Sequence, residues 1–474
     1  MNIGSLPSHV LIFPFPVQSH VNVMLNLGEI FTISGFQVTF LIPEHIEKGP
    51  RFANIHARFA RYPGFHFKMI SDGLPSNHPR TGERVKDLFE SIDIKTKPQF
   101  RDLLESGEST SNGRGPLTCI IADGIMSFTI DIAKDFKIPT ILFRPFSASC
   151  FWTLFCVPKL IEAGELPIKG EIDLDMVVAS IPGMDGVLRL RDLPSFCRVD
   201  DVTDPQLQHV VSETHRATSA YGLILNTFQD LEASAVTQIH SEIPRLYTIG
   251  PLHAHLKHAR ASHTRSSLTK EDRECLLWLD AQPLKSVIFV SFGNMTVLKW
   301  QQFIEFWHGL VDSGKPFLWV IPDNLIEGGR QILVEFMEGS EHRGEVVDWA
   351  PQEEVLSHPA IGCFWTHSGW NSTLESIYES VPMICWPFYA DQQVNSRLVG
   401  EVWKIGLDMK DICDRGIVAK MVSEVMEKRR EEFIKSAQET ALLARKAVGE
   451  GGSSCTNLVR LIEDIKLMNE SKSS

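Results

Sequence analysis

Short apolar runs alternate with amphipathic stretches along the first half of the chain. Apolar runs of strand length occur at 9–15, 36–43, 65–70, 117–123, 139–143, 221–227 and 246–252. Between them, helical spacing of apolar residues predicts helices at about 21–34 and 127–136, and a charged surface helix at 85–106. Apolar strands alternating with helices are typical of a parallel sheet covered on both faces.

The same pattern begins again in the second half of the chain. Strand-like runs occur at 286–293, 317–322, 345–350, 363–366 and 382–387, and helical sequence at 299–313, 415–448 and 456–468. A polar, histidine-rich stretch at 253–270 lacks periodicity and is interpreted as a linker.

These patterns predict an α/β protein with two doubly wound domains in tandem and a ligand site in the cleft between them. We expect four parts: an N-terminal domain, a linker with the start of the second domain, a C-terminal domain, and a last helix that packs back on the first domain. Their predicted bounds are 1–252, 253–285, 286–455 and 456–474.

Composition narrows the class of protein. Hydrophobic residues make up 43% and charged residues 22% of the 474 residues, as in a globular protein that is not embedded in a membrane. The net charge of −13 argues against a nucleic-acid partner or a polybasic membrane surface. Nine scattered cysteines without CxxC spacing, no signal sequence and no long apolar span predict a cytoplasmic protein with reduced thiols and no membrane span.

Two residues of the first half are candidates for acid–base chemistry. His20 and Asp123 each follow an apolar strand-like run, so we expect both at the carboxyl edge of the first sheet, where ligands bind. A histidine oriented by a carboxylate can remove a proton from a hydroxyl group. A loop histidine and a helix-capping aspartate are an equally good interpretation from these residues alone.

Two turns in the second half are candidates for phosphate binding. The turn 367–372 follows a strand and opens a helix, so its amide N–H groups and the helix dipole suit a diphosphate, with His367 as a further donor. Asn371 and Ser372 are also good N-cap residues, which is the purely structural alternative. The turn 291–294 carries Gly293 and by itself is more typical of a simple turn.

Other polar and aromatic residues surround this second turn. Trp349 suits either a core position or a plate for a flat base, and Glu375 either a solvated helix face or an acceptor for a ribose diol. Asp391 and Gln392 by themselves indicate only a helix start. The chain has no GxGxxG fingerprint and no Asp-x-Asp metal ligand pair, so we expect no dinucleotide cofactor and no metal.

The 44 residues Trp349–Gln392 closely resemble the signature segment of plant family 1 UDP-sugar-dependent glycosyltransferases. FPFPVQSHVNVML, IADG, IGPL, WLDAQP and VSFGN resemble further segments of that family, in the family's order. The resemblance covers the whole chain. It implies the GT-B fold, with two Rossmann-like domains of which the first binds mainly the acceptor and the second the donor.

The resemblance also implies roles for individual residues. Trp349 would stack on uracil, with Ala350 and Gln352 completing the uridine contacts, and Glu375 would bind the ribose hydroxyls. The diphosphate would be held by His367, Gly369, Asn371 and Ser372, with Ser291 and Gly293 nearby. Trp370, Asp391 and Gln392 would bind the sugar, and Trp370 with Gln392 goes with a preference for UDP-glucose in this family.

By the same resemblance His20 is the catalytic base and Asp123 its partner, in an inverting displacement that needs no metal or cofactor. The chain departs from the family pattern at several positions. Ser380 stands where glycine is usual at a helix end, where a left-handed residue costs about 1 kcal/mol. Pro145 replaces a frequent threonine, which leaves a secondary sugar contact in question.

Acceptor identity is indicated by weaker features. ISDGLP, HVLIFPFP and SFGNMTV most resemble the branch acting on terpenoids, including iridoids such as 7-deoxyloganetic acid, and on cyanohydrins. Candidate residues for an apolar acceptor pocket are Phe15, Met126, Phe146, Phe151 and Trp152.

The predicted function is therefore a monomeric UDP-glucose-dependent O-glucosyltransferase for a small lipophilic plant metabolite, with a terpenoid or iridoid as the leading acceptor. Three alternatives remain at this point. One is a transferase that forms glucose esters on a carboxylate acceptor. The others are an NAD(P)-dependent oxidoreductase and a non-catalytic sugar-nucleotide-binding protein.

Overall fold

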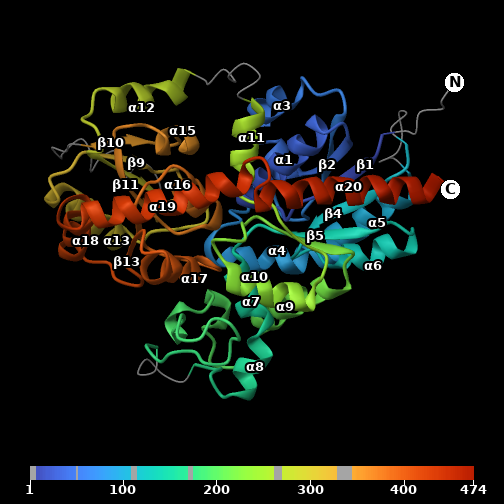
Figure 1. Ribbon diagram of the computed structural model, residues 1–474, viewed down its shortest axis with the longest axis horizontal. Helices are drawn as coiled ribbons and strands as arrows, with labels where there is room; N and C mark the ends of the chain where they lie inside the picture. Colours follow the sequence, from blue (N-terminus) through green and yellow to red (C-terminus); the bar gives the residue numbers. More distant parts are fainter. Residues whose placement is uncertain are drawn as a thin grey trace. The chain divides into compact units, whose positions relative to one another are not determined.

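The computed structural model describes residues 7–49, 52–107, 115–168, 174–260, 270–327 and 344–473. The chain forms two compact units, each built around a parallel sheet (Figure 1). Unit 1 consists of Met1–Pro158, Val202–Ser266 and Lys446–Ser474, and unit 2 of Lys159–Asp201 and Ser267–Arg445. The predicted tandem of doubly wound α/β domains is confirmed.

Unit 1 contains a seven-stranded sheet in the order β3-β2-β1-β4-β5-β6-β7, with every neighbouring pair parallel. The strands are β1 His9–Phe13, β2 Gln37–Pro43, β3 Phe65–Ile70, β4 Cys119–Asp123, β5 Thr140–Arg144, β6 Gly222–Leu225 and β7 Leu246–Thr248. β1, β4, β5 and β6 are buried along their whole length, which explains why their sequences are mostly apolar instead of alternating, with polar residues only at the strand ends.

Helices cover both faces of this sheet. The helices of unit 1 are α1 Gln18–Ile33, α2 Glu44–Glu47, α3 Phe52–Phe59, α4 Lys86–Ser91, α5 Lys97–Glu105, α6 Phe128–Asp135, α7 Ala148–Phe155, α9 Pro205–His215, α10 Ala233–Glu242, α11 Leu252–Arg260 and α20 Ser453–Ser473. α1, α11 and α20 share one apolar core with the sheet. On the opposite face Phe13 stacks on Phe100 of α5, with ring centroids 5.0 Å apart.

The C-terminal helix α20 is an integral part of unit 1. Leu461 and Ile465 are buried in its core, and Tyr247 at the edge of the sheet donates a 2.6 Å hydrogen bond to Asp464. Ser454 donates to the carbonyl of Gly250 at 2.6 Å. The last strand, β7, is therefore tied to the last helix by polar as well as apolar contacts.

Unit 2 contains a six-stranded sheet in the order β10-β9-β8-β11-β12-β13, again parallel throughout. The strands are β8 Val287–Ser291, β9 Phe317–Val320, β10 Gly344–Val347, β11 Ile361–Thr366, β12 Met383–Cys385 and β13 Gly406–Asp408. The helices are α12 Lys270–Asp280, α13 Trp300–Asp312, α15 Gln352–Leu356, α16 Trp370–Tyr378, α17 Gln392–Arg397, α18 Arg415–Ser423 and α19 Arg430–Val448. α13 and α18 pack on one face of the sheet through an aromatic-rich core.

Short segments complete the element order. Helix α8 spans Val157–Glu162, and α8 and α19 lie where the chain passes from one unit to the other. Single turns of 3₁₀-helix occur at Gly82–Val85, Leu190–Asp192, Ser195–Cys197 and Arg216–Ser219, and π-helical turns at Ile92–Thr96, Leu398–Val402 and Glu424–Lys428. Within the described ranges, no helix is long and apolar enough to cross a membrane.

Three sequence predictions differ from the structure. The helix expected at 85–106 is broken by the π-helical turn Ile92–Thr96, because Pro98 has no N–H to donate and its ring crowds the carbonyl one turn earlier. The stretch interpreted as a linker begins with α11, which buries Leu252 and Leu256 in the core of unit 1; residues 261–269 of that stretch lie outside the described residues. β13, only three residues long, was not predicted.

Both sheets have a switch point at which the strand order reverses direction. It lies between β1 and β4 in unit 1 and between β8 and β11 in unit 2. In open α/β sheets, ligands bind outside the carboxyl ends of the strands at this point. The candidate residues that follow these four strands are therefore the ones to inspect first.

Candidate active site

His20 and Asp123 meet at the switch point of unit 1. His20 lies in the first turn of α1, directly after the loop that leaves β1, and Asp123 is the last residue of β4. His20 Nδ1 is 2.6 Å from Asp123 Oδ2. The carboxylate side chain is fully buried, whereas the imidazole keeps 17% of its surface exposed. The sequence placed both residues at one sheet edge, and the structure brings them into direct contact.

This contact determines which nitrogen of His20 is available. A carboxylate oxygen accepts hydrogen bonds, so Nδ1 carries the hydrogen and Nε2 keeps its lone pair. Asp123 is itself held in place, because its Oδ1 accepts from the backbone N–H of Ile125 at 3.1 Å. The pair has the geometry of an oriented general base whose positive charge, once formed, faces a buried carboxylate.

Phe15 places an aromatic wall beside the imidazole. Its ring centroid is 5.4 Å from that of His20 and 5.7 Å from that of Phe89. Of the other acceptor-pocket candidates, Met126, Phe151 and Trp152 are buried and Phe146 is half-buried. Phe15 is thus the candidate in direct ring contact with His20.

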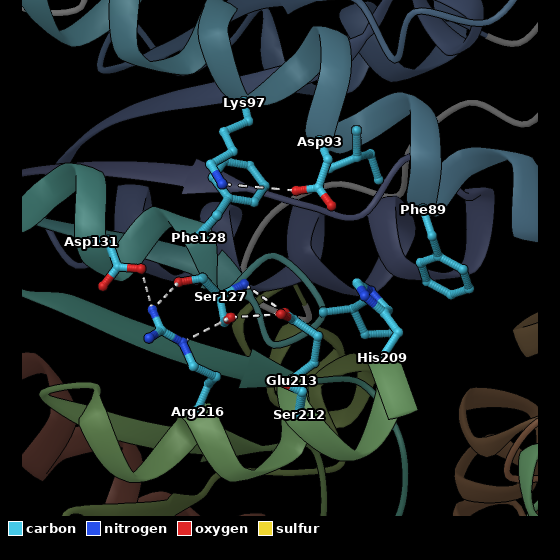
Figure 2. A pocket seen from close by; sticks show the side chains of 12 residues that line it. Phe89, Asp93, Lys97, Ser127, Phe128, Asp131, His209, Ser212, Glu213 and Arg216 are labelled. Atoms are coloured by element: carbon cyan, nitrogen blue, oxygen red, sulfur yellow. Dashed lines mark hydrogen bonds and ion pairs between the residues drawn. The ribbon is translucent and has the colours of Figure 1, made fainter. Parts of the chain in front are cut away.

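A cavity of about 200 Å³ lies close to the dyad in unit 1, and sequence reasoning missed it. Figure 2 shows its lining, with Phe89 from α4 and polar side chains from the π-helical turn Ile92–Thr96, α5, the start of α6, α9 and the 3₁₀ turn Arg216–Ser219. Phe89, which stacks on Phe15, and Ile125, which binds Asp123, are both in its wall. The predicted acceptor residues do not line this cavity.

The charged groups of this cavity are largely bound to one another. Glu213 accepts hydrogen bonds from the N–H and hydroxyl of Ser127 at 2.8 and 2.7 Å (Figure 2). Arg216 binds Asp131 at 2.5 Å. These pairs fix α6 to α9 and leave little unmatched charge for a ligand.

In unit 2, His367 lies between two glycines at the switch point. A Cβ atom built on Gly293, after β8, would be 2.6 Å from His367 Nε2, and one built on Gly369 would be 2.5 Å from the same atom. Cβ contacts this short are essentially never seen, so a larger residue at either position would have to displace the imidazole. Gly293 also has a φ of +68°, which glycine adopts without strain. We call His367, Gly293 and Gly369 the glycine cradle.

The imidazole of the glycine cradle is neutral. Burial lowers the pKa of His367 to about 4, because the charged form loses its hydration there. At neutral pH the ring therefore offers a hydrogen-bond donor without a permanent charge. Trp370 begins α16 immediately afterwards, so the N–H groups of the first turn of this helix lie next to the cradle.

Three of the predicted donor residues form one hydrogen-bonded group. Gln352 Nε2 donates to Glu375 Oε2 at 2.6 Å and to Ser372 Oγ at 2.9 Å. Burial, with the charge of Glu353 adding to it, raises the pKa of Glu375 to about 8. The side chains predicted to bind uridine (Gln352), ribose (Glu375) and the diphosphate (Ser372) are therefore joined by hydrogen bonds in advance.

Gln392 and Asp391 stand at the start of α17. The carbonyl oxygen of Gln392 accepts from the N–H groups of Phe388 and Tyr389 at 2.7 and 2.8 Å, which fixes the amide so that its NH₂ end is presented for other contacts. Asp391 accepts from Asn395 at 2.6 Å. Asn395 also donates to the carbonyl of Ser368, so it ties this helix to the turn that carries His367.

Asn395 is a positioning residue that sequence reasoning missed. It is fully buried and lies four residues after Asp391, a spacing that puts both on one face of a helix. The remaining donor candidates are also in unit 2: Trp349 is half-buried, Ala350, Ser291 and Trp370 are buried, and Asn371 is half-buried at the start of α16. Within the described ranges, no cluster of three or more His, Cys, Asp or Glu side chains could hold a metal ion.

Residues 228–438 match the sequence profile of the family described as UDP-glucoronosyl and UDP-glucosyl transferase. A 7-deoxyloganetic acid glucosyltransferase from Catharanthus roseus is 52% identical to the chain, over 98% of each protein. A 7-deoxyloganetin glucosyltransferase from Gardenia jasminoides is 40% identical, over 97% of this chain and 98% of that protein.

Solved structures show the same likeness. Phytolacca americana UGT2, complexed with UDP-2-fluoro-glucose and pterostilbene, superposes with a TM-score of 0.80 at 26% identity, over 98% of this chain and all of the other. A Polygonum tinctorium UDP-glucosyltransferase capable of glucosylating indoxyl, complexed with 3,4-dichloroaniline, gives a TM-score of 0.79 at 27% identity, over 98% and 99% of the two chains.

Proposed function

The chain belongs to the family of UDP-glucuronosyl and UDP-glucosyl transferases, and from this premise we propose an inverting, UDP-glucose-dependent O-glucosyltransferase with His20 as its general base. The observation that carries the proposal is the 2.6 Å contact between His20 Nδ1 and the buried carboxylate of Asp123 at a switch point. It leaves Nε2 of a partly exposed imidazole as the proton acceptor. A passive nucleotide-sugar carrier has no use for an oriented base, and the 52% identity to glucosyltransferases favours a transferase over an oxidoreductase.

In the proposed reaction, His20 Nε2 takes the proton of an acceptor hydroxyl as that oxygen forms a bond to C1 of glucose. The bond from C1 to the phosphate oxygen breaks, and UDP leaves with the electron pair. Asp123 stabilises the imidazolium that results. A single displacement on an α-linked donor gives a β-glucoside.

Unit 2 is proposed to hold the donor. Trp349, Gln352 and Glu375 would bind uridine, and the glycine cradle with the first turn of α16, including Ser372, would bind the diphosphate. A neutral donor at His367 and the helix N-terminus both stabilise the charge that grows on the leaving UDP. The presented NH₂ group of Gln392, with Trp370 and Asp391, would bind the sugar.

The proposed acceptor is an iridoid terpenoid, with 7-deoxyloganetic acid as the first candidate. Its support is the 52% identity, over almost the whole chain, to two Catharanthus roseus enzymes named for that acid. Relatives named for 7-deoxyloganetin are 37–40% identical. The apolar ring of Phe15 beside His20 suits a small lipophilic acceptor.

We also propose that the enzyme works in the cytosol as a monomer. All nine cysteines lie in the described part of the chain and carry thiols, and seven of them are buried. Reduced cysteines in this number are typical of a reducing compartment. Fractionation of the tagged protein and a sedimentation measurement test the two statements.

The activity test incubates the purified protein with UDP-glucose and an acceptor panel that includes 7-deoxyloganetic acid, and measures released UDP. Products are then treated with mild alkali, which cleaves glucose esters and leaves glucosides intact. The proposal expects an alkali-stable β-glucoside. An alkali-labile product would instead identify the carboxylate as the attacking group and replace the hydroxyl mechanism, and no UDP release with any acceptor would overturn the proposal.

A further inference from the structure

Arg144, the last residue of β5, is a buried cation whose side chain is almost without partners. Its exposed fraction is 0%, and no group within the described residues accepts a hydrogen bond from Nε or Nη1. Nη2 makes one long contact, 3.5 Å, with the hydroxyl of Thr214. Buried charged groups are normally paired and fully hydrogen-bonded, because an unpaired one is costly. A guanidinium with several unmatched N–H donors therefore calls for an anionic partner.

The guanidinium lies beside the catalytic dyad. It packs so closely on Gly124, the residue after Asp123, that a Cβ atom there would be 2.2 Å from Arg144 Nε. The rings of Phe146 and Phe151 lie 5.2 and 5.8 Å from its Cζ atom, at cation–π distance. Both rings belong to the predicted acceptor pocket, so the unmatched cation is placed among the residues expected to contact the acceptor.

The two carboxylates that favour the charged form of Arg144 do not bind it. They are Asp123 and Glu213, and both act only at longer range, while burial lowers the pKa of the guanidinium. Asp123 is committed to His20 and Ile125, and Glu213 to Ser127 (Figure 2). Arginine stays protonated in proteins even when buried. Among the residues that the structure describes, the cation therefore keeps its charge without a counter-ion of its own.

We propose that Arg144 binds a carboxylate group of the acceptor, so that the substrate class is a hydroxy acid whose acid group is recognised and whose hydroxyl is glucosylated. This rests on the proposed function. A guanidinium presents N–H donors in a fork that matches a carboxylate bidentately. A carboxylate bound in this way is not the nucleophile, which accounts for a glucoside instead of a glucose ester. Since the guanidinium is fully buried and Phe146 is only half-buried, Phe146 is the ring that turns to admit the acid.

The other cations near the dyad are less suited to this role. Arg216 is bound to Asp131 at 2.5 Å, and Lys97 lies 3.9 Å from Asp93 in the polar cavity (Figure 2). Both are substantially exposed and already matched by a carboxylate. A cation that is exposed to water and already paired would add little to the affinity for an acidic acceptor. No carboxylate within the described ranges is bound to Arg144, which distinguishes it from Arg216 and Lys97.

The test compares 7-deoxyloganetic acid with its methyl ester, which keeps the shape and the hydroxyl but has no negative charge. Steady-state kcat/KM is measured for both acceptors in the wild type, Arg144→Gln and Arg144→Lys. The matched control is Arg101→Gln, which removes an exposed arginine paired with Asp135 in the same unit. Thermal denaturation of each variant monitors folding.

We expect the wild type to prefer the acid, and Arg144→Gln to lower kcat/KM for the acid by on the order of tenfold to a hundredfold, mostly through KM, because a hydrogen bond to a charged group is lost. The kcat/KM for the ester should change little in Arg144→Gln, the value for Arg144→Lys should lie between those of Arg144→Gln and the wild type, and Arg101→Gln should match the wild type.

The inference is overturned if the wild type uses acid and ester equally, or if Arg144→Gln lowers kcat/KM for both alike. Arg144 would then have a structural role, while the glucosyltransferase proposal stands. If neither acceptor is glucosylated but another on the panel is, the acid is not the substrate and the inference is also overturned. The comparison in the wild type decides the matter even if Arg144→Gln does not fold.

Discussion

The two sheets carry histidines at corresponding switch points, yet the neighbours of the two histidines are opposite in kind. His20 in unit 1 is in contact with a buried carboxylate at 2.6 Å and is partly exposed. His367 in unit 2 lies between Gly293 and Gly369, and burial lowers its pKa to about 4. The strand order 3-2-1-4 of one sheet is repeated as 10-9-8-11 in the other, but His20 follows β1 whereas His367 follows β11, the counterpart of β4.

The two surroundings differ in whether they stabilise or destabilise a protonated imidazole. A carboxylate beside an imidazole stabilises the protonated ring, which suits a group that must take up a proton during the reaction. The glycine cradle disfavours the protonated ring but lets a large group approach closely, which suits a neutral donor to a phosphate. The fold places one histidine at each switch point, on opposite sides of it, and the residues next to each histidine decide its chemistry.

The largest effect should come from His20→Ala. Removing a positioned general base should lower kcat by about 10²–10⁴-fold with a hydroxyl acceptor, while UDP binding, measured by calorimetry, should be unchanged because it depends on unit 2. The control is His358→Ala: His358 lies 3.1 Å from Asp280 but precedes β11, at the opposite edge of the sheet from His367. If His20→Ala kept most of its kcat, His20 would not be the general base, and the contrast with His367 would be wrong.

A smaller effect is expected from filling the glycine cradle. Gly293 and Gly314 share a φ of +68°, but only at Gly293 would a Cβ meet His367; at Gly314 there is nothing within 4 Å. Gly314→Ala should cost about 1 kcal/mol of stability for the left-handed backbone, and Gly293→Ala at least as much, since its Cβ also meets His367. Gly293→Ala alone should raise the Kd for UDP by about tenfold to a hundredfold, the loss of one hydrogen bond to a charged group. Equal UDP affinity of the two variants in calorimetry would show that the cradle does not hold His367 for the phosphate.

Glu375 extends the comparison to an acid. Its pKa is raised from 4.5 to about 8, so the folded protein binds its proton more tightly than the unfolded chain does. Stability is therefore lost as pH rises from about 4.5 to about 8 and is level above that, with a slope of at most about 1.4 kcal/mol per pH unit. Relative to Glu375→Gln, the melting temperature of the ligand-free wild type should fall between pH 6 and pH 8. Parallel curves for the two proteins over this range would contradict the raised pKa.

The smallest effect concerns backbone strain at the end of α16. Ser380 has a φ of +60°, as its predicted place in a left-handed helix cap requires. Ser380→Gly should stabilise the protein by about 1 kcal/mol, a rise in melting temperature of about 2–4 °C, with kcat and the Kd for UDP unchanged. A change in UDP affinity would mean that this cap also positions the side chains of α16 that surround the donor.

Much of this arrangement was readable from the sequence because both switch points follow mostly apolar strands. Such runs identify His20, Asp123 and His367 as residues at a sheet edge without any knowledge of tertiary contacts. The predicted family and enzyme class, and the GT-B architecture implied with them, are confirmed by the comparisons, which exclude the oxidoreductase alternative.

What could not be predicted depends on residues distant in the sequence. The glycine cradle joins Gly293 to His367, 74 positions later, and only folding shows that a larger residue there would have to displace the imidazole. Arg144 was visible as a cation ending an apolar strand, but its lack of a counter-ion is a property of the packed interior. Pro98 indicates a break in the helix expected at 85–106, and this signal is present in the sequence. The four-residue spacing from Asp391 to Asn395 likewise indicates a contact on one helix face.

The helix α20 has a consequence for how the protein is made. Leu461 and Ile465 complete the core of a sheet whose first strand begins at His9, so that core cannot close until the C-terminal part of the chain has left the ribosome. Domains generally fold in the order of their synthesis, the N-terminal one first. Here the residues 267–445 of unit 2 are all synthesised before the helix that finishes unit 1. The nascent chain therefore carries an N-terminal sheet with one apolar face incompletely covered during the synthesis of unit 2, and this is the interval in which a chaperone has most to protect.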